Sequence, residues 1–335
     1  MAEPVIAVDD LTVRFVRRDN SVAAVNGVSF ALVPGEVMTI LGESGSGKSV
    51  TLKALMGLLP DHARVEGRIR VTGRDLFALA PTELAKLRGG TVSMVFQEPI
   101  TALDPVYTIG QQIAETIVQH DGVDRATAMK RAHELLERVK IPSAARRLKN
   151  YPHELSGGMR QRAMIALALA CKPAVLLADE PTTALDVTVQ IQILLLLRQL
   201  QQELGMAVLF VTHDVGVAAE ISDRVAVMYA GRLVETGTVR EVLRERRHPY
   251  TRGLLASTVH GGMRGRDLDM IPGSPPSLSA LPPGCAFAPR CKEAIDACHV
   301  AEPPVVQVNS GAMVRCVRAA DALEWHVAGP TTVPA

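Results

Sequence analysis

The stretch LGESGSGKSV, residues 41–50, decides the fold of this chain. Its glycines leave backbone N–H groups free to converge on an anion. The spacing Gly42-x-x-x-x-Gly47-Lys48-Ser49 is that of a nucleotide-binding P-loop. We therefore predict a phosphate cradle made of Gly42, Glu43, Ser44, Gly45, Ser46, Gly47, Lys48, Ser49 and Val50.

The segments on either side of this loop supply the context that the motif requires. Residues 36–40, EVMTI, are an apolar run typical of a buried strand, and residues 49–59 carry helical spacing. A helix N-terminus adds unpaired N–H groups and the positive end of its dipole to an anion site. Lys48 can then reach the terminal phosphates, and the Ser49 hydroxyl can ligate Mg²⁺. The alternative is a flexible Gly/Ser turn, which a full match in this context disfavours.

The composition limits what the nucleotide is used for. The chain has 335 residues, and its 36 Lys and Arg nearly balance its 35 Asp and Glu. Because this balance leaves no broad basic surface, we expect no nucleic acid as a partner. The apolar stretch of residues 163–171 is far shorter than the roughly 20 residues that cross a bilayer. The amino terminus lacks the basic and apolar regions of a secretory signal, so we expect a cytoplasmic chain.

A second strand-like run, PAVLLADEP (residues 173–181), ends in two carboxylates. Parallel α/β sheets place ligand chemistry at the carboxyl ends of their strands. Asp179 would hold Mg²⁺, directly or through water, and Glu180 would polarise a water molecule for attack on the γ-phosphate. The alternative is an ordinary charged junction between strand and loop, and the P-loop upstream favours the catalytic interpretation.

The run LSGGMRQRAMIALALA, residues 155–170, predicts a second helix N-terminus suited to an anion. One nucleotide does not need two such cradles from one chain. We therefore predict that Ser156, Gly157 and Gly158 cap the γ-phosphate of ATP held by another subunit. With this segment the sequence resembles the ATP-binding subunits of ATP-binding cassette (ABC) transporters, whose signature motif commonly has Gln where this chain has Met159.

The resemblance covers residue 5 to about residue 244 and implies further roles. Gln97 in MVFQEP would touch the metal and water and couple to the membrane subunits. Asp186 in TTALD would pass across the dimer interface, and His213 in LFVTHD would contact the γ-phosphate. Phe15 in LTVRF occupies the place of the aromatic residue that stacks on adenine. The implied catalytic residues are Lys48, Gln97, Glu180 and His213, and the implied Mg²⁺ ligands are Ser49, Gln97 and Asp179.

The family also implies the fold and its divisions. We expect an α/β P-loop NTPase cassette over residues 1–245, with a RecA-like core, an antiparallel β subdomain and a helical subdomain. Two segments of helical period place the helical subdomain at about residues 98–171, where transporters receive coupling helices from the membrane partner. We expect its apolar stripe to be core rather than docking surface. The stripe consists of Ile113, Ile117, Leu135, Leu136 and Val139.

Residues 246–335 form a Pro- and Cys-rich extension. Its segment IPGSPPSLSALPPGCAFAPRC is too rich in Pro, Gly and Ser for regular helix or sheet. In a reducing cytosol, gathered cysteines favour a metal site over disulfides, and an all-sulfur ligand set suits Zn²⁺ or an iron–sulfur cluster. Cys171, alone in an apolar helix, is expected to be a small core residue. The four gathered cysteines are Cys285, Cys291, Cys298 and Cys316.

The HPYT, IPGSPP and PPGCAF segments, together with these cysteines, resemble the C-terminal extension of oligopeptide and dipeptide importer ATPases. That resemblance implies a [4Fe–4S] cluster, with Zn²⁺ or free thiols as the alternatives. It also implies a peripheral ATPase at the cytoplasmic face of the inner membrane that energises peptide import. The implied partners are two transmembrane permeases, a second ABC ATPase subunit and an extracytoplasmic substrate-binding protein. The alternatives are an importer of nickel or another small solute, and a soluble ABC ATPase without a transport function.

Overall fold

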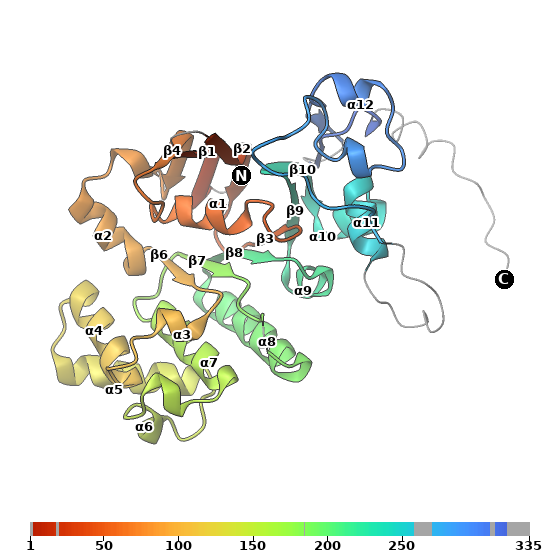
Figure 1. Ribbon diagram of the computed structural model, residues 1–335. Helices are drawn as coiled ribbons and strands as arrows, with labels where there is room; N and C mark the ends of the chain where they lie inside the picture. Colours follow the sequence, from red (N-terminus) through yellow and green to blue (C-terminus); the bar gives the residue numbers. More distant parts are fainter. Residues whose placement is uncertain (1–2, 18–19, 184, 258–269, 309–311, 320–335) are drawn as a thin grey trace, which may run out of the picture.

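A mixed eight-stranded sheet forms the centre of the fold (Figure 1). The computed structural model describes residues 3–17, 20–183, 185–257, 270–308 and 312–319. In spatial order the strands are β11 (Val306–Gln307), β12 (Met313–Val314), β10 (Arg232–Thr238), β9 (Arg224–Tyr229), β3 (Val37–Leu41), β8 (Ala207–Thr212), β7 (Val175–Asp179) and β6 (Val92–Val95). From β9 to β6 neighbouring strands are parallel, whereas β10, β12 and β11 are antiparallel to their neighbours.

Burial explains why the parallel strands have apolar sequences. Every residue of β3, β6, β7 and β8 is buried. A parallel sheet that is covered on both faces favours continuous apolar runs over alternation of apolar and polar residues. The strands predicted at residues 36–40 and 173–181 are confirmed, the first beginning one residue later and the second confined to Val175–Asp179. The α/β core is therefore as expected.

A separate antiparallel sheet confirms the predicted β subdomain. Its strands in spatial order are β2 (Asn20–Leu32), β1 (Ile6–Arg17), β4 (Ala63–Val71) and β5 (Arg74–Asp75). The P-loop helix α1 (Lys48–Leu55) contacts both β2 and β7. It ends earlier than the predicted 49–59 because Gly57 adopts a φ of +60° and turns the chain. Helix η1 (Leu76–Ala78) and helix α2 (Pro81–Gly90) then lead to the edge strand β6.

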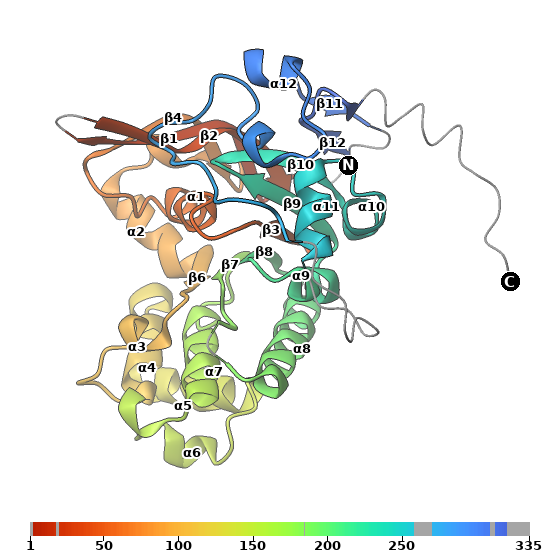
Figure 2. The ribbon, with the colours of Figure 1, turned by 45° about the vertical axis from the view of Figure 1, so that its right-hand side comes forward.

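A group of helices follows β6 and lies at the bottom of Figures 1 and 2. It consists of α3 (Pro99–Ala102), α4 (Ile109–Asp121), α5 (Arg125–Arg138), α6 (Ala144–Arg147), η2 (Pro152–Glu154) and α7 (Gly157–Ala168). Thr108 and Gln111 form a capping box at α4, and Asp124 caps α5 by accepting two backbone N–H bonds. The predicted apolar stripe is core: four of its residues are buried, and Leu135 packs against the same cluster.

The position of Cys171 differs slightly from the prediction that it lies in a helix. Helix α7 ends at Ala168, so the cysteine lies in the following turn, where it is half-buried and its Sγ approaches the carbonyl of Thr116 at 3.8 Å. Burial is the first cause that raises the pKa of its thiol to about 11. The side chain still packs against the core cluster of the helical group.

The remaining elements of the cassette follow β7. They are α8 (Val187–Leu204), α9 (Val215–Ile221) and α10 (Val239–Glu245). Helix α8 lies below the sheet in both views, on the side away from α1. No helix within the described ranges is long and apolar enough to cross a bilayer.

The extension packs against the cassette and joins its central sheet. It contains α11 (Pro249–Ala256), η3 (Ala288–Arg290), α12 (Ala297–Val300) and the strands β11 and β12. The stretch predicted to lack regular helix or sheet, residues 271–291, contains none except the short 3-10 helix η3 at its end. Strand β12 pairs with β10 through Glu235↔Val314 and Thr236↔Met313. The last part of the predicted extension, residues 320–335, lies outside the described residues.

The HPYT segment ties this extension to the cassette. His248 is 1% exposed, and its Nδ1 accepts the N–H of Tyr250 at 3.0 Å, which caps α11. The ring also hydrogen-bonds to the backbone of Arg315, beside β12. Burial first, and then the charge of Arg252, lower the pKa of His248 from 6.5 to about 3. The imidazole is therefore neutral in the folded chain at any ordinary pH.

This buried histidine makes stability depend on pH. As the pH falls below about 6.5, the unfolded chain takes up a proton at this position before the folded chain does, so the free energy of unfolding falls toward pH 3. We expect the melting temperature of His248→Gln to fall less steeply between about pH 7 and about pH 5 than that of the wild type. The exposed His299→Gln serves as the control and should keep the wild-type slope. Equal slopes for wild type and His248→Gln would contradict this assignment.

Candidate functional site

A cavity of about 580 Å³ gathers most of the predicted nucleotide residues. It lies where β3, β7 and β8 end and where the P-loop, Glu180 and His213 follow them in sequence. Its lining consists of Ala24, Glu43, Ser44, Gly45, Gly47, Lys48, Ser49, Val50, Gln97, Glu180, Thr183, His213, Leu254 and Leu278. The structure thus brings together residues that are up to 170 positions apart in the predicted motifs, from Glu43 to His213.

Close backbone approaches explain the glycines of the P-loop. Gly47 has a φ of +108°, and a Cβ there would lie 2.3 Å from the carbonyl oxygen of Ala24. A Cβ on Gly42 would lie 2.2 Å from the carbonyl oxygen of Met228. Only glycine accommodates such contacts, and at Gly47 the positive φ adds a second reason. The loop conformation therefore depends on its glycines at both ends.

Lys48 is the cation of the cavity. It is 4% exposed, and its Nζ donates to the carbonyl oxygens of Gly42 and Glu43, both at 2.9 Å. Burial lowers its pKa, while the nearby carboxylates of Glu180, Asp179 and Glu43 oppose that shift. The ammonium group is thus held inside the loop by two carbonyls, which phosphate oxygens can replace.

Ser49 and Asp179 form a pair of oxygen ligands at the base of the loop. The Ser49 hydroxyl donates to Oδ1 of Asp179 at 2.8 Å. Burial raises the pKa of Asp179, and the hydrogen bond from Ser49 partly offsets that rise. A divalent cation placed here would relieve the cost of the buried carboxylate, and hydroxyl plus carboxylate oxygens are the donors that Mg²⁺ prefers. The residues present therefore fit Mg²⁺.

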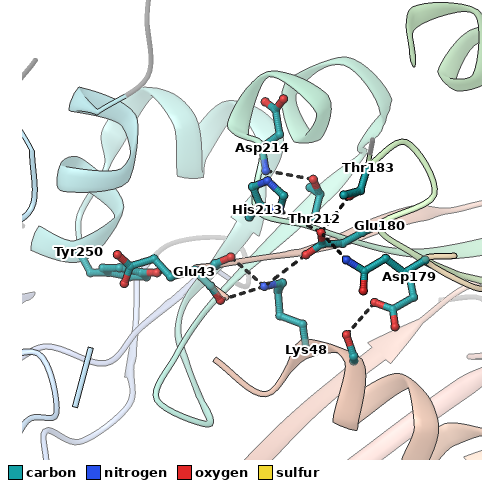
Figure 3. Close-up of polar contacts among 12 residues, drawn as sticks. Glu43, Lys48, Asp179, Glu180, Thr183, Thr212, His213, Asp214 and Tyr250 are labelled. Atoms are coloured by element: carbon teal, nitrogen blue, oxygen red, sulfur yellow. Dashed lines mark hydrogen bonds and ion pairs between the residues drawn. The ribbon is translucent and has the colours of Figure 1, made fainter. Parts of the chain in front are cut away.

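Glu180 lies at the centre of the polar contacts in Figure 3. Its φ is +43°, a strained value for a residue with a Cβ. Its Oε2 lies 3.0 Å from Nδ1 of His213 and accepts bonds from Thr183 Oγ1 at 3.0 Å and Gln97 Nε2 at 3.4 Å. Its Oε1 lies 3.8 Å from Lys48 Nζ. The carboxylate is thus held by four groups that all line the cavity.

Several predicted residues lie away from this cavity. Ser156 is the N-cap of α7 and accepts the N–H of Met159, and both Ser156 and Gly157 are exposed. Asp186 caps α8 through Val189. Phe15 is half-buried in β1, with its ring centroid 5.7 Å from that of His62. None of Phe15, Ser156, Gly157, Gly158 and Asp186 is among the described residues that line the cavity.

Residues of the extension also line the cavity, and the sequence did not predict this contact. Leu254 of α11 and Leu278 belong to its lining. The Tyr250 hydroxyl accepts the backbone N–H of Glu43 at 3.0 Å, and Figure 3 shows these two residues side by side. Arg290 forms a two-pronged ion pair with Glu43 at 2.7 and 3.1 Å. The HPYT motif was visible in the sequence, but no local pattern indicates that it meets the P-loop.

The four cysteines of the extension lie in one region. Burial comes first among the causes that raise the pKa of Cys316 to about 11, followed by the proximity of Cys285, Cys291 and Cys298. The N–H of Cys285 donates to the carbonyl of Cys298 at 2.8 Å, and a Cβ at Gly284 would clash with that same carbonyl. In the part of the chain that the structure describes, no group of three or more His, Cys, Asp or Glu is arranged to hold a metal ion.

Comparison with known proteins agrees with this geometry. Residues 25–183 match the ABC transporter family, and residues 234–298 match the C-terminal region of oligopeptide/dipeptide transporters. A relative from Brucella abortus (strain 2308), named as a peptide import ATP-binding protein, is 52% identical over 94% of this chain and 97% of its own. The oligopeptide transport ATP-binding protein OppD of Salmonella typhimurium is 46% identical over 96% of each chain.

Solved structures support the same assignment. A dimeric ATP-binding cassette in a post-hydrolysis state, bound to ADP and phosphate, is 30% identical with a TM-score of 0.63, over 70% of this chain and 99% of its own. The fold and the cavity thus define an ATP-binding cassette of the ABC type. The chain belongs to the ATP-binding proteins of ABC transporters, in the oligopeptide/dipeptide group. It is accordingly an ATPase whose substrate is ATP and whose cofactor is Mg²⁺.

Proposed function

We propose that this chain energises the import of di- and oligopeptides through separate membrane permeases. The observation that carries the proposal is a complete nucleotide cavity whose wall includes the extension that matches oligopeptide/dipeptide transporters. The relatives named for peptide import and oligopeptide transport support the cargo class. In this role the chain lies at the cytoplasmic face of the inner membrane, and an extracytoplasmic binding protein delivers the peptide.

The same proposal includes the division of the chain. The cassette occupies residues 1–245 with its helical subdomain at about residues 98–171, and the extension occupies residues 246–335. Helix α10 ends at Glu245, and Arg246 adopts a φ of +49° that breaks the helix. Helices α3 to α7 fall between residues 99 and 168, which supports the limits of the helical subdomain.

The cavity residues have separable roles in hydrolysis. The loop amides and Lys48 bind the phosphates of ATP. Ser49, Asp179 and Gln97 would hold Mg²⁺, which would supply positive charge to the γ-phosphoryl group. Glu180 accepts the proton of the attacking water. His213, with its Nδ1 3.0 Å from Oε2 of Glu180, orients that carboxylate and would contact the γ-phosphoryl group. The strained backbone of Glu180 is consistent with a residue that is held for function rather than for stability.

A second cassette subunit completes each site. Ser156, Gly157 and Gly158 stand outside the cavity of their own chain, and the first two are exposed. They are therefore available to cover ATP in a partner cassette, of the same chain or a homologue. Asp186, at the start of α8, would contribute to the same interface. The solved cassette that resembles this chain is itself a dimer.

Exposed apolar side chains mark where the permeases would dock. Four of them lie between residue 96 and the start of α4 at Ile109, and the fifth is at position 151. The N–H of Ile109 donates to the carbonyl of Asn150, so the start of α4 lies beside the residue before position 151. Large exposed apolar groups in one region indicate an interaction surface. They are Phe96 at 37%, Ile100 at 66%, Val106 at 70%, Tyr107 at 54% and Tyr151 at 38% exposure.

Replacing Glu180 tests the assignment of the base. We expect Glu180→Gln to lower the rate of ATP hydrolysis by at least about 100-fold, because the amide cannot accept the proton, while Mg²⁺-ATP still binds. Steady-state hydrolysis and equilibrium binding of ATP measure the two effects separately. The exposed Glu220→Gln is the matched control and should hydrolyse ATP at the wild-type rate. Unchanged hydrolysis in Glu180→Gln would remove Glu180 from the role of base.

We also propose that the four cysteines hold a [4Fe–4S] cluster. Four thiolates are the ligand set of such clusters. Backbone N–H groups of Phe287 and Ala288 are directed at the thiol of Cys285, and that of Glu293 at Cys291, and such bonds tune cluster sulfurs. Among the described residues no group of three or more His, Cys, Asp or Glu is arranged to hold a metal ion, so the proposal rests on the ligand type and on these bonds.

The cluster has a direct test. Protein purified without oxygen should contain iron and acid-labile sulfide in equal amounts and absorb visible light, and a Cys298→Ser variant should lose most of both. Cys171→Ser is the matched control, since this thiol lies in the helical group, and should keep the full content. Protein that contains zinc but no sulfide would replace the cluster by the Zn²⁺ alternative. Protein that contains neither iron nor zinc would overturn the proposal of a metal site.

A further inference from the structure

One arginine of the extension is built into the nucleotide site. Arg290 ends η3, directly before Cys291, and is 6% exposed. Its Nη1 and Nη2 pair with the two carboxylate oxygens of Glu43 at 2.7 and 3.1 Å. Glu43 is the second residue of the P-loop and lies 247 positions earlier in the chain. A bidentate ion pair of this kind fixes both the position and the direction of the carboxylate.

All five N–H donors of this guanidinium have an acceptor. Besides the two bonds to Glu43, Nε donates to the carbonyl of Pro272 at 2.9 Å. The remaining two donors lie 3.4 Å from the Tyr229 hydroxyl and the Gly273 carbonyl. Burial works against the charge, but the bonds to Glu43 and Tyr229 outweigh it and raise the pKa of Arg290. The side chain is therefore a fixed cation in a fully specified position.

Glu43 is an unusual neighbour for a phosphate site. The loop must bind a polyanion, and a carboxylate beside it repels that anion unless its charge is paired. Glu43 lines the cavity, and its carbonyl accepts a bond from Lys48. Its carboxylate is also close enough to raise the pKa of Lys48 against the larger effect of burial. An unpaired Glu43 would therefore compete with the phosphates for the cation that binds them.

A second contact from the extension holds the same residue. The backbone N–H of Glu43 donates to the hydroxyl of Tyr250, which belongs to α11 and is fully buried. Because this bond fixes the backbone and Arg290 fixes the side chain, Glu43 is held at two points. The two bonds of the ion pair direct the carboxylate toward Arg290.

We propose that Arg290 is a positioning residue of the ATP site, which neutralises Glu43 and keeps its carboxylate from the phosphates and from Lys48. The extension would then contribute to the affinity of the nucleotide site for ATP. The proposal rests on the proposed function only in that the cavity binds ATP. It requires neither the peptide cargo nor the cluster.

The test is a double-mutant cycle on ATP affinity. The equilibrium dissociation constant of Mg²⁺-ATP is measured for wild type, Arg290→Gln, Glu43→Gln and the double variant, each with its melting temperature. We expect Arg290→Gln to weaken binding by about tenfold or more, Glu43→Gln to bind no more weakly than wild type, and the double variant to return within about threefold of wild type. A purely structural role would weaken binding in both single variants, since each breaks the same ion pair.

Controls keep the test decisive. Arg252→Gln removes another arginine of the extension, one in an exposed ion pair with Glu293, and should leave ATP affinity unchanged. If Arg290→Gln does not fold, Arg290→Lys replaces it, with a smaller loss of affinity that Glu43→Gln again restores. A double variant as weak as Arg290→Gln, or an Arg290→Gln variant with wild-type affinity, would overturn the proposal. Wild type that binds no ATP would instead contradict the proposed function itself.

Discussion

Strand register in the central sheet is the constraint on which the nucleotide site depends. Strand β3 pairs with β8 so that Leu41 lies opposite Thr212, and β8 pairs with β7 so that Val211 lies opposite Asp179. The P-loop, the two acidic residues and His213 therefore begin at one level of the sheet. A slip of one residue would turn each strand's side chains to the opposite face. Because these strands are buried on both faces, the apolar runs that form the sheet also align the polar residues that follow them.

The extension depends on the same sheet for its own position. Strand β12 continues the sheet beyond β10, and His248 links the start of α11 to the backbone of Arg315 beside that strand. From this anchorage Tyr250 and Arg290 reach Glu43. The extension, which differs from the cassette in composition, is thus folded onto the cassette. Its buried Tyr250 and Arg290 contact Glu43 in the loop that binds phosphate.

The sequence predicted those features that are encoded locally. The P-loop and the buried strands carry their signals within a few residues, and the structure confirms both strands and the α/β core. Phe15 could not be placed in this way, since a ring that stacks on a ligand and a ring packed in a strand have the same local sequence; its stacking on adenine stays a prediction. The Arg290–Glu43 pair could not be predicted at all, because it joins residues 247 positions apart with no motif between them.

The partners of this chain test most directly whether it is the ATPase of a membrane importer. The measurement is mass spectrometry of the complex that the Glu180→Gln chain retains from detergent-solubilised native membranes in the presence of Mg²⁺-ATP. We expect two multi-spanning permeases together with a second cassette subunit, either this chain again or a homologue. Recovery of ribosomal or DNA-repair proteins without any permease would contradict this expectation.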